Sequence, residues 1–354
     1  MAYTTINDSS AQFQTVLWTG NSTDNRSITN TGNANLQPDV VWIKNRNSNQ
    51  NHYLYDSTRG ANVQLLPADT AGETTVADRM QAFQTDGFQV GSSSEVNYNS
   101  YTYIGWQWKA TAGTTASNGN GSITSTVQAN TTAGFSIVKW TGTGSAATIG
   151  HGLGVTPQMI IVKNLDKSSQ WAVYHYKVGN TKYLALNDAD AAATYSGYWN
   201  DTSPTTSVFS VGSDGDVSGG NGEEVISYCF APIKGYSKFG AYTGNNNADG
   251  PFIYTGFKPA WVIIKAVADT GGAKNWRIAD TKRSSSSGNN TIDKQLMSNN
   301  TDAEDSGNDV DLLSNGFKVR STAAQWNANG IDIVYAAFAE NPFVATNNVV
   351  ATAR

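Results

Sequence analysis

The chain has 354 residues and a net charge of −5, and only 14% of its residues are charged, against about 25% in an ordinary soluble domain. It has no cluster of Lys and Arg, so binding to nucleic acid through the phosphate backbone is not expected. The one cysteine, Cys229, excludes a disulfide within the chain and is expected to be buried. No signal peptide and no apolar run long enough to span a membrane are recognised.

Glycine, serine, threonine and asparagine replace the missing charges, together with 10 Trp, 16 Tyr and 12 Phe. These are residues of turns and strands, and strong helix formers are scarce. The composition therefore predicts an all-β protein.

One segment occurs three times in the sequence. Each copy is a proline followed by mainly apolar residues and a lysine, an apolar density typical of a strand that is covered on both faces. The three copies run from Pro38 to Lys44, from Pro157 to Lys163 and from Pro259 to Lys265.

Four further landmarks recur around this segment in the same order. An aromatic-Thr-Gly triplet precedes it; an aromatic segment, a Phe-x-Val segment and an apolar closing strand follow it. The triplets are residues 18–20, 140–142 and 242–244, the aromatic segments begin at His52, Trp171 and Trp276, and the closing strands are residues 103–110, 225–232 and 333–340. Five landmarks in one order predict a triplicated unit of roughly 100 residues, longer than the repeats of solenoid proteins.

We therefore expect three tandem antiparallel β-sandwich domains, each large enough for its own core. The boundaries divide the chain as follows: residues 1–110, the first repeat with an N-terminal arm; 111–134, a linker; 135–235, the second repeat; 236–343, the third; and 344–354, a C-terminal tail.

In the first repeat, strands are expected at residues 13–18, 40–44, 52–55, 88–90 and 101–109, and residues 73–83 are the best candidate for a helix. The linker, rich in Gly, Ser, Thr and Asn, is expected to be flexible, with one edge strand on which Ile123 and Val127 face the same side. Because the next junction is short, repeats two and three should pack closely, while repeat one should be held more loosely.

Few residues suggest catalytic or metal chemistry. His52, His151 and His175 share no metal-ligand spacing and are interpreted as packing residues. The sequence Asp214-Gly-Asp216 resembles half of a calcium loop, but position 12 of that loop is Val225 instead of a carboxylate, so a turn is favoured and an irregular calcium site stays open. A pair of glycosidase carboxylates is not excluded by spacing, yet no glutamate recurs across the repeats, and no enzyme activity or cofactor is predicted.

The tryptophans divide into two groups. Those in the repeated strands are core candidates: Trp42, Trp106, Trp108, Trp140 and Trp261. Trp199 and Trp326 lie in polar, loop-like sequence beside Asn and Asp, where an exposed indole could stack on a sugar. These two are the candidate glycan-binding residues, and pinning of a loop to the sandwich is the alternative for both.

The whole set of landmarks resembles a lectin-like or jelly-roll domain common in structural proteins of tailed phages, especially marine ones. The resemblance is carried by Phe135-Ser-Ile-Val-Lys-Trp-Thr-Gly, by Ile149-Gly-His-Gly-Leu-Gly-Val-Thr-Pro157 and by Ala336-Ala-Phe-Ala-Glu-Asn-Pro-Phe343, and it covers nearly the whole chain. It implies jelly-roll sandwiches in a protein of the virion exterior, made in the bacterial cytoplasm and usually assigned to the tail or tail fibre.

The function implied is that of a non-enzymatic tail fibre or receptor-binding component that contacts host-surface glycan, with other virion proteins as partners. Fibres are generally trimers, so a homotrimer is expected by analogy. The alternatives are a purely structural capsid or tail decoration or adaptor protein and, less favoured, a glycan-degrading tailspike.

Overall fold

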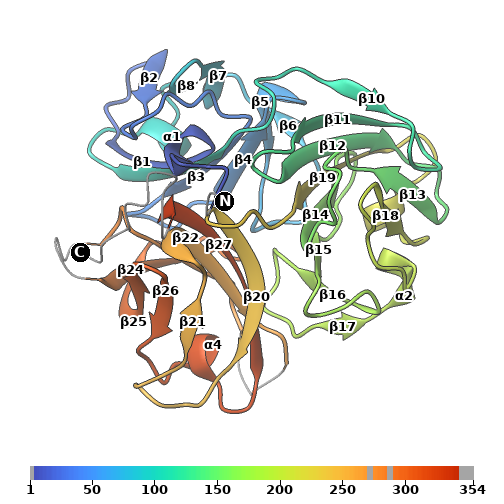
Figure 1. Cartoon of the computed structure of the whole chain (residues 1–354). Helices are drawn as coiled ribbons and strands as arrows, with labels where there is room; N and C mark the ends of the chain where they lie inside the picture. Colours follow the sequence, from blue (N-terminus) through green and yellow to red (C-terminus); the bar gives the residue numbers. More distant parts are fainter. Residues whose placement is uncertain (1–3, 269–273, 285–289, 343–354) are drawn as a thin grey trace.

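In the computed structural model, residues 4–268, 274–284 and 290–342 are described. Nearly all regular structure in them is antiparallel β-sheet, and the helices are single turns, which confirms the all-β sandwich prediction. The expected C-terminal tail, residues 344–354, lies outside the described residues. The chain forms three lobes around a common centre (Figure 1), with unit one in blue, unit two in green and unit three in orange and red.

Unit one consists of a six-stranded sheet in the order β1-β9-β3-β4-β5-β6 and a three-stranded sheet in the order β2-β8-β7. A 3₁₀ turn, η1 (Ser9–Ala11), precedes it. Its elements are β1 (Phe13–Thr19), β2 (Arg26–Thr29), β3 (Val40–Asn45), β4 (His52–Asp56), β5 (Gly60–Leu65), β6 (Thr74–Thr75), β7 (Met80–Gln84), β8 (Gly87–Val90), α1 (Ser94–Asn97) and β9 (Thr102–Trp108).

Unit two has an eight-stranded sheet in the order β10-β11-β12-β19-β14-β15-β16-β17 and a two-stranded sheet of β13 and β18. Its elements are β10 (Ala116–Asn118), β11 (Ser125–Asn130), β12 (Phe135–Thr141), β13 (Ala147–Gly150), β14 (Met159–Asn164), β15 (Ala172–His175), β16 (Lys182–Ala185), β17 (Ala193–Thr194), α2 (Ser196–Trp199), β18 (Val208–Val211), α3 (Gly215–Ser218) and β19 (Glu224–Phe230).

Unit three is one continuous sheet in the order β20-β27-β22-β23-β24-β25-β26-β21, which repeats the neighbours seen in the other two units. Its elements are β20 (Ser237–Thr243), β21 (Phe252–Tyr254), β22 (Phe257–Ala266), β23 (Arg277–Asp280), β24 (Thr291–Met297), β25 (Asp305–Leu313), β26 (Gly316–Val319), α4 (Ala324–Asn327) and β27 (Asp332–Pro342).

The recurring apolar segment forms β3, β14 and β22, and it is covered on both faces as predicted. In β3, Val41 and Ile43 pack inside unit one's own sandwich, whereas Val40 and Trp42 belong to a larger cluster to which all three units contribute. The strand period of two directs alternate side chains to these two layers. The three units therefore share a central core in addition to the cores of units one and two.

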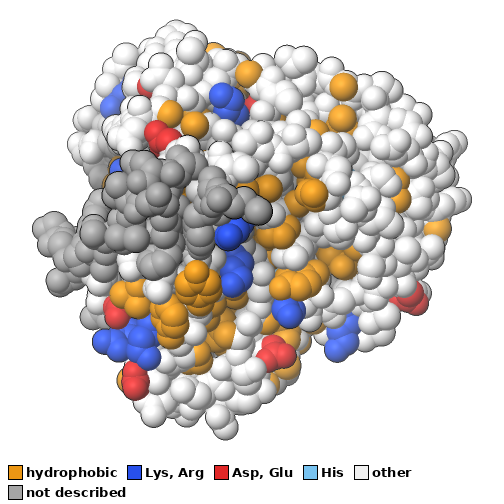
Figure 2. Space-filling model, viewed as in Figure 1, with side chains coloured by type: hydrophobic (Ala, Val, Ile, Leu, Met, Phe, Trp, Pro, Cys, Tyr) orange, Lys and Arg blue, Asp and Glu red, His pale blue; other side chains and the backbone are white. Residues whose placement is uncertain are grey.

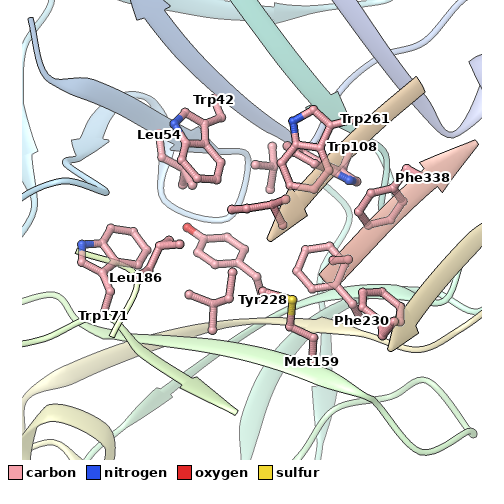
Figure 3. A pocket seen from close by; sticks show the side chains of 15 residues that line it. Trp42, Leu54, Trp108, Met159, Trp171, Leu186, Tyr228, Phe230, Trp261 and Phe338 are labelled. Carbon is pink, nitrogen blue, oxygen red and sulfur yellow. The ribbon is translucent and has the colours of Figure 1, made fainter. Parts of the chain in front are cut away.

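The central core is built on three aromatic rings, one from each closing strand. The ring centroids of Trp108 and Phe230 are 6.5 Å apart, those of Trp108 and Phe338 are 5.7 Å apart, and those of Phe230 and Phe338 are 5.8 Å apart. Around them lies a small apolar cavity of about 40 Å³ (Figure 3), lined by residues of all three units. It has room for water but is lined by apolar surface and lacks the several polar partners that a buried water needs, so we interpret it as a packing gap.

Unit one is not held loosely, so that expectation is wrong. The recurring lysine is buried in each unit and donates a hydrogen bond to a neighbouring unit, across an interface that we call a seam. Lys44 Nζ donates to Thr301 O of unit three at 3.2 Å, Lys163 Nζ to Thr70 O of unit one at 2.8 Å and Lys265 Nζ to Asp188 O of unit two at 3.4 Å. Each seam thus has an equivalent contact, and linker length did not determine how closely the units pack.

The aromatic residue that opens each following strand contacts the same neighbouring unit as the lysine. Trp171 Nε1 donates to Leu66 O at 3.0 Å, and Trp276 Nε1 donates to Ala185 O at 2.8 Å. His52 occupies the third position, with Nε2 2.9 Å from Met297 O. Its Nδ1 accepts from Trp42 Nε1, which leaves Nε2 as the donor of the neutral ring. This confirms the packing interpretation of His52.

Two local predictions need correction. Residues 73–83 are not a helix but contain β6 and the start of β7. The backbone N–H of Glu73 donates to Leu165 O of unit two, and that of Val76 donates to Asn62 O. Pairing with other parts of the fold therefore overrides the weak helix propensity of this segment. The linker is likewise not a loose tether, because it forms β10 and β11. The strand with Val127 inward is confirmed as β11, but it is not the edge strand that was expected, because β10 pairs with its other side.

If the three units share one core, they should unfold together. We expect Phe338→Ala to lower the midpoint of a single calorimetric transition of the whole chain, with a loss of about 3–5 kcal/mol from removal of a buried ring. A separate early transition of unit three alone, with the remaining heat unchanged, would contradict the shared core.

Because of the buried lysines, we expect the free energy of unfolding to increase as the pH rises from about 8 to about 10. Desolvation lowers the pKa of Lys44, Lys163 and Lys265 from 10.5 to about 8. Between these values the unfolded chain binds more protons than the folded one, so the free energy of unfolding rises with pH, by up to about 3 kcal/mol for each lysine. Urea unfolding at pH 7.5 and 9.5 measures it.

The matched variant for this test is Lys163→Met, which should reduce the rise by roughly a third, since one of three equivalent groups is removed. Above pH 10 the trend reverses, because burial raises the pKa of Tyr53 and Tyr103 to about 12. Stability that is flat or falling from pH 7.5 to 9.5 would refute the assignment.

Candidate functional site

The structure buries both tryptophans that the sequence placed in exposed loops. Trp199, at the end of α2, is 2% exposed and meets the ring of Tyr174 edge-on at 5.7 Å. Trp326, in α4, is 0% exposed and donates from Nε1 to Gln295 Oε1 at 2.8 Å. Neither indole has a free face for a sugar, so their assignment as glycan-binding residues is wrong.

Trp326 follows from the repeat itself, because α4 is the third copy of a one-turn helix after the Phe-x-Val strand. In this copy Trp326 takes the place of Val96 in α1 and Val217 in α3, both of which are also fully buried. The sequence around Trp326 is polar, yet in each of these one-turn helices the last two residues are buried, and in α4 these are Trp326 and Asn327.

The segment that holds Trp199 does expose an aromatic ring, four residues before the tryptophan. Tyr195, which precedes α2, is 44% exposed. Its ring lies over Gly197, where a Cβ atom would come within 2.5 Å of Cζ. Glycine at 197 therefore allows the ring to lie flat along the helix start.

Tyr195 is the outermost member of a cluster that we call the tyrosine–aspartate patch: Tyr183, Tyr195, Tyr198, Asp214 and Asp216. The ring of Tyr198 lies 4.2 Å from that of Tyr183 and 5.4 Å from that of Tyr195. The patch joins β16, α2 and α3 of unit two, and Figure 1 labels the first two of these elements.

Two carboxylates fix the hydroxyls of the patch. Tyr195 Oη donates to Asp214 Oδ2 at 3.0 Å, and the buried Tyr198 donates to Asp216 Oδ2 at 2.7 Å. The hydrogen bond to Asp214 and the charge of that carboxylate raise the pKa of Tyr195, so its hydroxyl stays protonated at neutral pH. A half-exposed ring beside a carboxylate offers stacking and hydrogen-bond acceptors in one place.

Asp214 and Asp216 do not form the calcium loop that their spacing resembles. Asp214 caps α3, with Oδ1 accepting from the Asp216 backbone N–H at 2.8 Å, and a short helix stands where a plain turn was favoured. In the residues that the structure describes, no group of three or more His, Cys, Asp or Glu side chains is arranged to hold a metal ion.

The remaining predicted residues are in the core. Cys229 is fully buried, and burial raises the pKa of its thiol to about 12, which leaves no reactive thiolate. His151 and His175 are also buried, and desolvation lowers the pKa of both rings. The tryptophans of the repeated strands, Trp42, Trp106, Trp108, Trp140 and Trp261, are buried as predicted.

Sequence reasoning missed Tyr195 because tyrosine is frequent throughout this chain. Other outward aromatic rings are those of Tyr98, Phe252 and Tyr254. A usable signal was the Tyr-Ser-Gly-Tyr-Trp sequence of residues 195–199, where the glycine leaves room for a ring.

Truncation of Trp326 and truncation of Tyr195 should lower the stability of the protein by very different amounts. Trp326→Ala should cost about 3–5 kcal/mol of unfolding free energy through loss of a buried indole. Tyr195→Ala should cost no more than about 0.5 kcal/mol, since the ring is at the surface. Urea unfolding of both variants tests this, and a stable, folded Trp326→Ala protein would contradict the burial.

Comparison with known proteins found one family, described as Domain of unknown function (DUF7483), which matches residues 8–342. No match was found among curated proteins or among solved structures. Within the described residues, no helix combines the length and the apolar character that crossing a membrane requires.

Proposed function

The chain belongs to the family of the domain of unknown function DUF7483. We propose that it is a non-enzymatic structural protein of a tailed-phage virion. In this proposal it serves as a tail fibre or receptor-binding component that binds host-surface glycan. The observation that carries the glycan assignment is the exposed ring of Tyr195 beside the Asp214 carboxylate. The virion assignment is supported by the resemblance of the repeated landmarks to phage structural domains.

The physical character of the surface is consistent with this proposal. Figure 2 shows a face that is mostly uncharged, with scattered Lys, Arg, Asp and Glu side chains and no broad charged field. Sugars are bound mainly through ring faces and hydrogen bonds, which such a surface can supply without strong electrostatics. The shared core would keep the patch rigid on an external appendage.

Binding of purified host-surface polysaccharide, measured by isothermal titration calorimetry, tests the glycan assignment. Tyr195→Ala should weaken binding at least tenfold, equivalent to about 1.4 kcal/mol, while thermal stability stays unchanged. Tyr98→Ala is the matched control, because that ring is equally exposed but lies in unit one. Equal binding by the wild type and Tyr195→Ala would remove the assignment.

A capsid or tail decoration or adaptor protein is the second proposal, and the seams favour it: three units closed around one core form a stiff building block. The number of copies per virion separates the two roles, since hundreds favour decoration and a small multiple of three or six favours a fibre. Sedimentation of the purified chain tests the homotrimer expected for a fibre. New reducing ends after incubation with the polysaccharide would instead support the tailspike alternative.

A further inference from the structure

The outer edge of β1 differs from the same edge in unit two. Strands β1, β12 and β20 occupy equivalent places, each paired with its unit's closing strand. In unit two, β11 adds to the other side of β12, whereas β1 and β20 end their sheets. The linker thus adds a strand to this edge in unit two, whereas the same edge has no added strand in units one and three.

The backbone groups on the β1 edge point away from the sheet. Lys109 N–H donates to Gln12 O, so by the alternation of antiparallel ladders the even-numbered residues of β1 pair with β9. Phe13, Thr15 and Leu17 therefore direct their N–H and C=O groups outward. Their counterparts in unit two, Phe135, Ile137 and Lys139, face Asn130, Gln128 and Thr126 of β11.

At each of the three seams, something different lies against this sheet edge. At the seam between units one and two, β11 is present and Gln128 Nε2 donates to Ser57 Oγ at 2.9 Å and to Thr58 Oγ1 at 2.8 Å. At the seam between units two and three, Tyr176 of unit two donates to Phe239 O on the β20 edge at 3.3 Å.

The third seam, between units three and one, contains a groove of about 190 Å³ along the β1 edge. Its walls include Thr281 and Lys282, which occupy in unit three the place that Ser57 and Thr58 occupy in unit one. The opposite wall is unit one, with Thr15, Gly32 and Asn33 among the lining residues. The groove therefore lies where β11 lies in unit two.

Thr15 supplies an independent sign of a missing partner. Thr15 is 6% exposed and lines the groove, and its hydroxyl is buried without a hydrogen-bond partner in the structure. A buried hydroxyl without a partner costs about 1–3 kcal/mol, and a strand laid on β1 would place backbone groups beside it.

We propose that this groove binds an extended, uncharged segment of a partner polypeptide, which adds to β1 as an antiparallel strand. The chemistry of the segment is read from β11, whose residues Ser125–Asn130 are uncharged and turn one apolar side chain, Val127, inward. Main-chain hydrogen bonds to the outward groups of β1 supply affinity, as in other cases of strand addition. The proposal is independent of the glycan patch, which lies in unit two.

The probe is a fluorescent peptide with the sequence of residues 122–133, titrated with the full chain and followed by anisotropy. We expect saturable binding that falls at least tenfold for Thr15→Pro, because proline removes an outward N–H and is tolerated on an edge strand. Ala241→Pro, the same change on the β20 edge, should leave binding unchanged. The melting temperature of each variant is measured alongside.

A peptide carrying Gln128→Pro, which loses the N–H that faces β12 in unit two, tests the mode of binding without changing the protein and should bind at least tenfold more weakly. Equal binding of both peptides, or no saturable binding, would overturn the proposal. A chain ending at Pro342 is assayed in parallel, because residues 343–354 follow the groove residue Asn341 in sequence. Binding by the shortened chain alone would identify those residues as the occupant and overturn the assignment to a partner.

Discussion

The structure depends on the burial of the recurring strand from both sides. Its alternate side chains fill a sandwich within one unit and a core common to all three, so neither layer can form fully without the other. The closing strand beside it delivers Trp108, Phe230 and Phe338 to the centre, within 6.5 Å of one another. A unit folded alone would expose these rings and their apolar surroundings to water, at about 25 cal/mol for each Å² of apolar surface. Association of the three units is therefore part of folding.

The seams add polar contacts that are specific to this arrangement. Asp56 accepts from Tyr228 of unit two and is paired with Arg59, and Asp280 accepts from Trp106 of unit one and is paired with Arg283. Unit two departs from this pattern, with His175 and Val178 in the places of the aspartate and the arginine. Instead, His175 Nε2 lies 3.2 Å from Tyr335 O of unit three. Buried ion pairs of this kind contribute little net stability but penalise a wrong neighbour, so they help to fix the order of the units around the centre.

Much of the fold could be predicted because its landmarks are core residues, and packing imposes the same residue types on every copy. The triplicated sandwich, the strands and the buried tryptophans of those strands followed from periodicity. The common core could not be predicted. An apolar strand indicates that both of its faces are covered, but it does not show whether the cover comes from the same unit or from a neighbouring unit. Trp326 shows the limit for the site: polar neighbours in sequence do not expose a side chain when a one-turn helix directs it inward. The role proposed for Tyr195 depends on its hydrogen bond to Asp214, a contact between two elements that no local sequence pattern records.

The cyclic order of the seams has a consequence for how such a chain could evolve. In a linear array each new repeat adds one interface, so length can drift by duplication. Here the seams already join unit one to two, two to three and three to one, and a ring has no end at which to add. A fourth copy would have to open a seam and enlarge a centre now filled by three rings, with loss of the contacts that close it. The number of repeats is thus set by geometry, and variation is confined to the loops and edges that face outward.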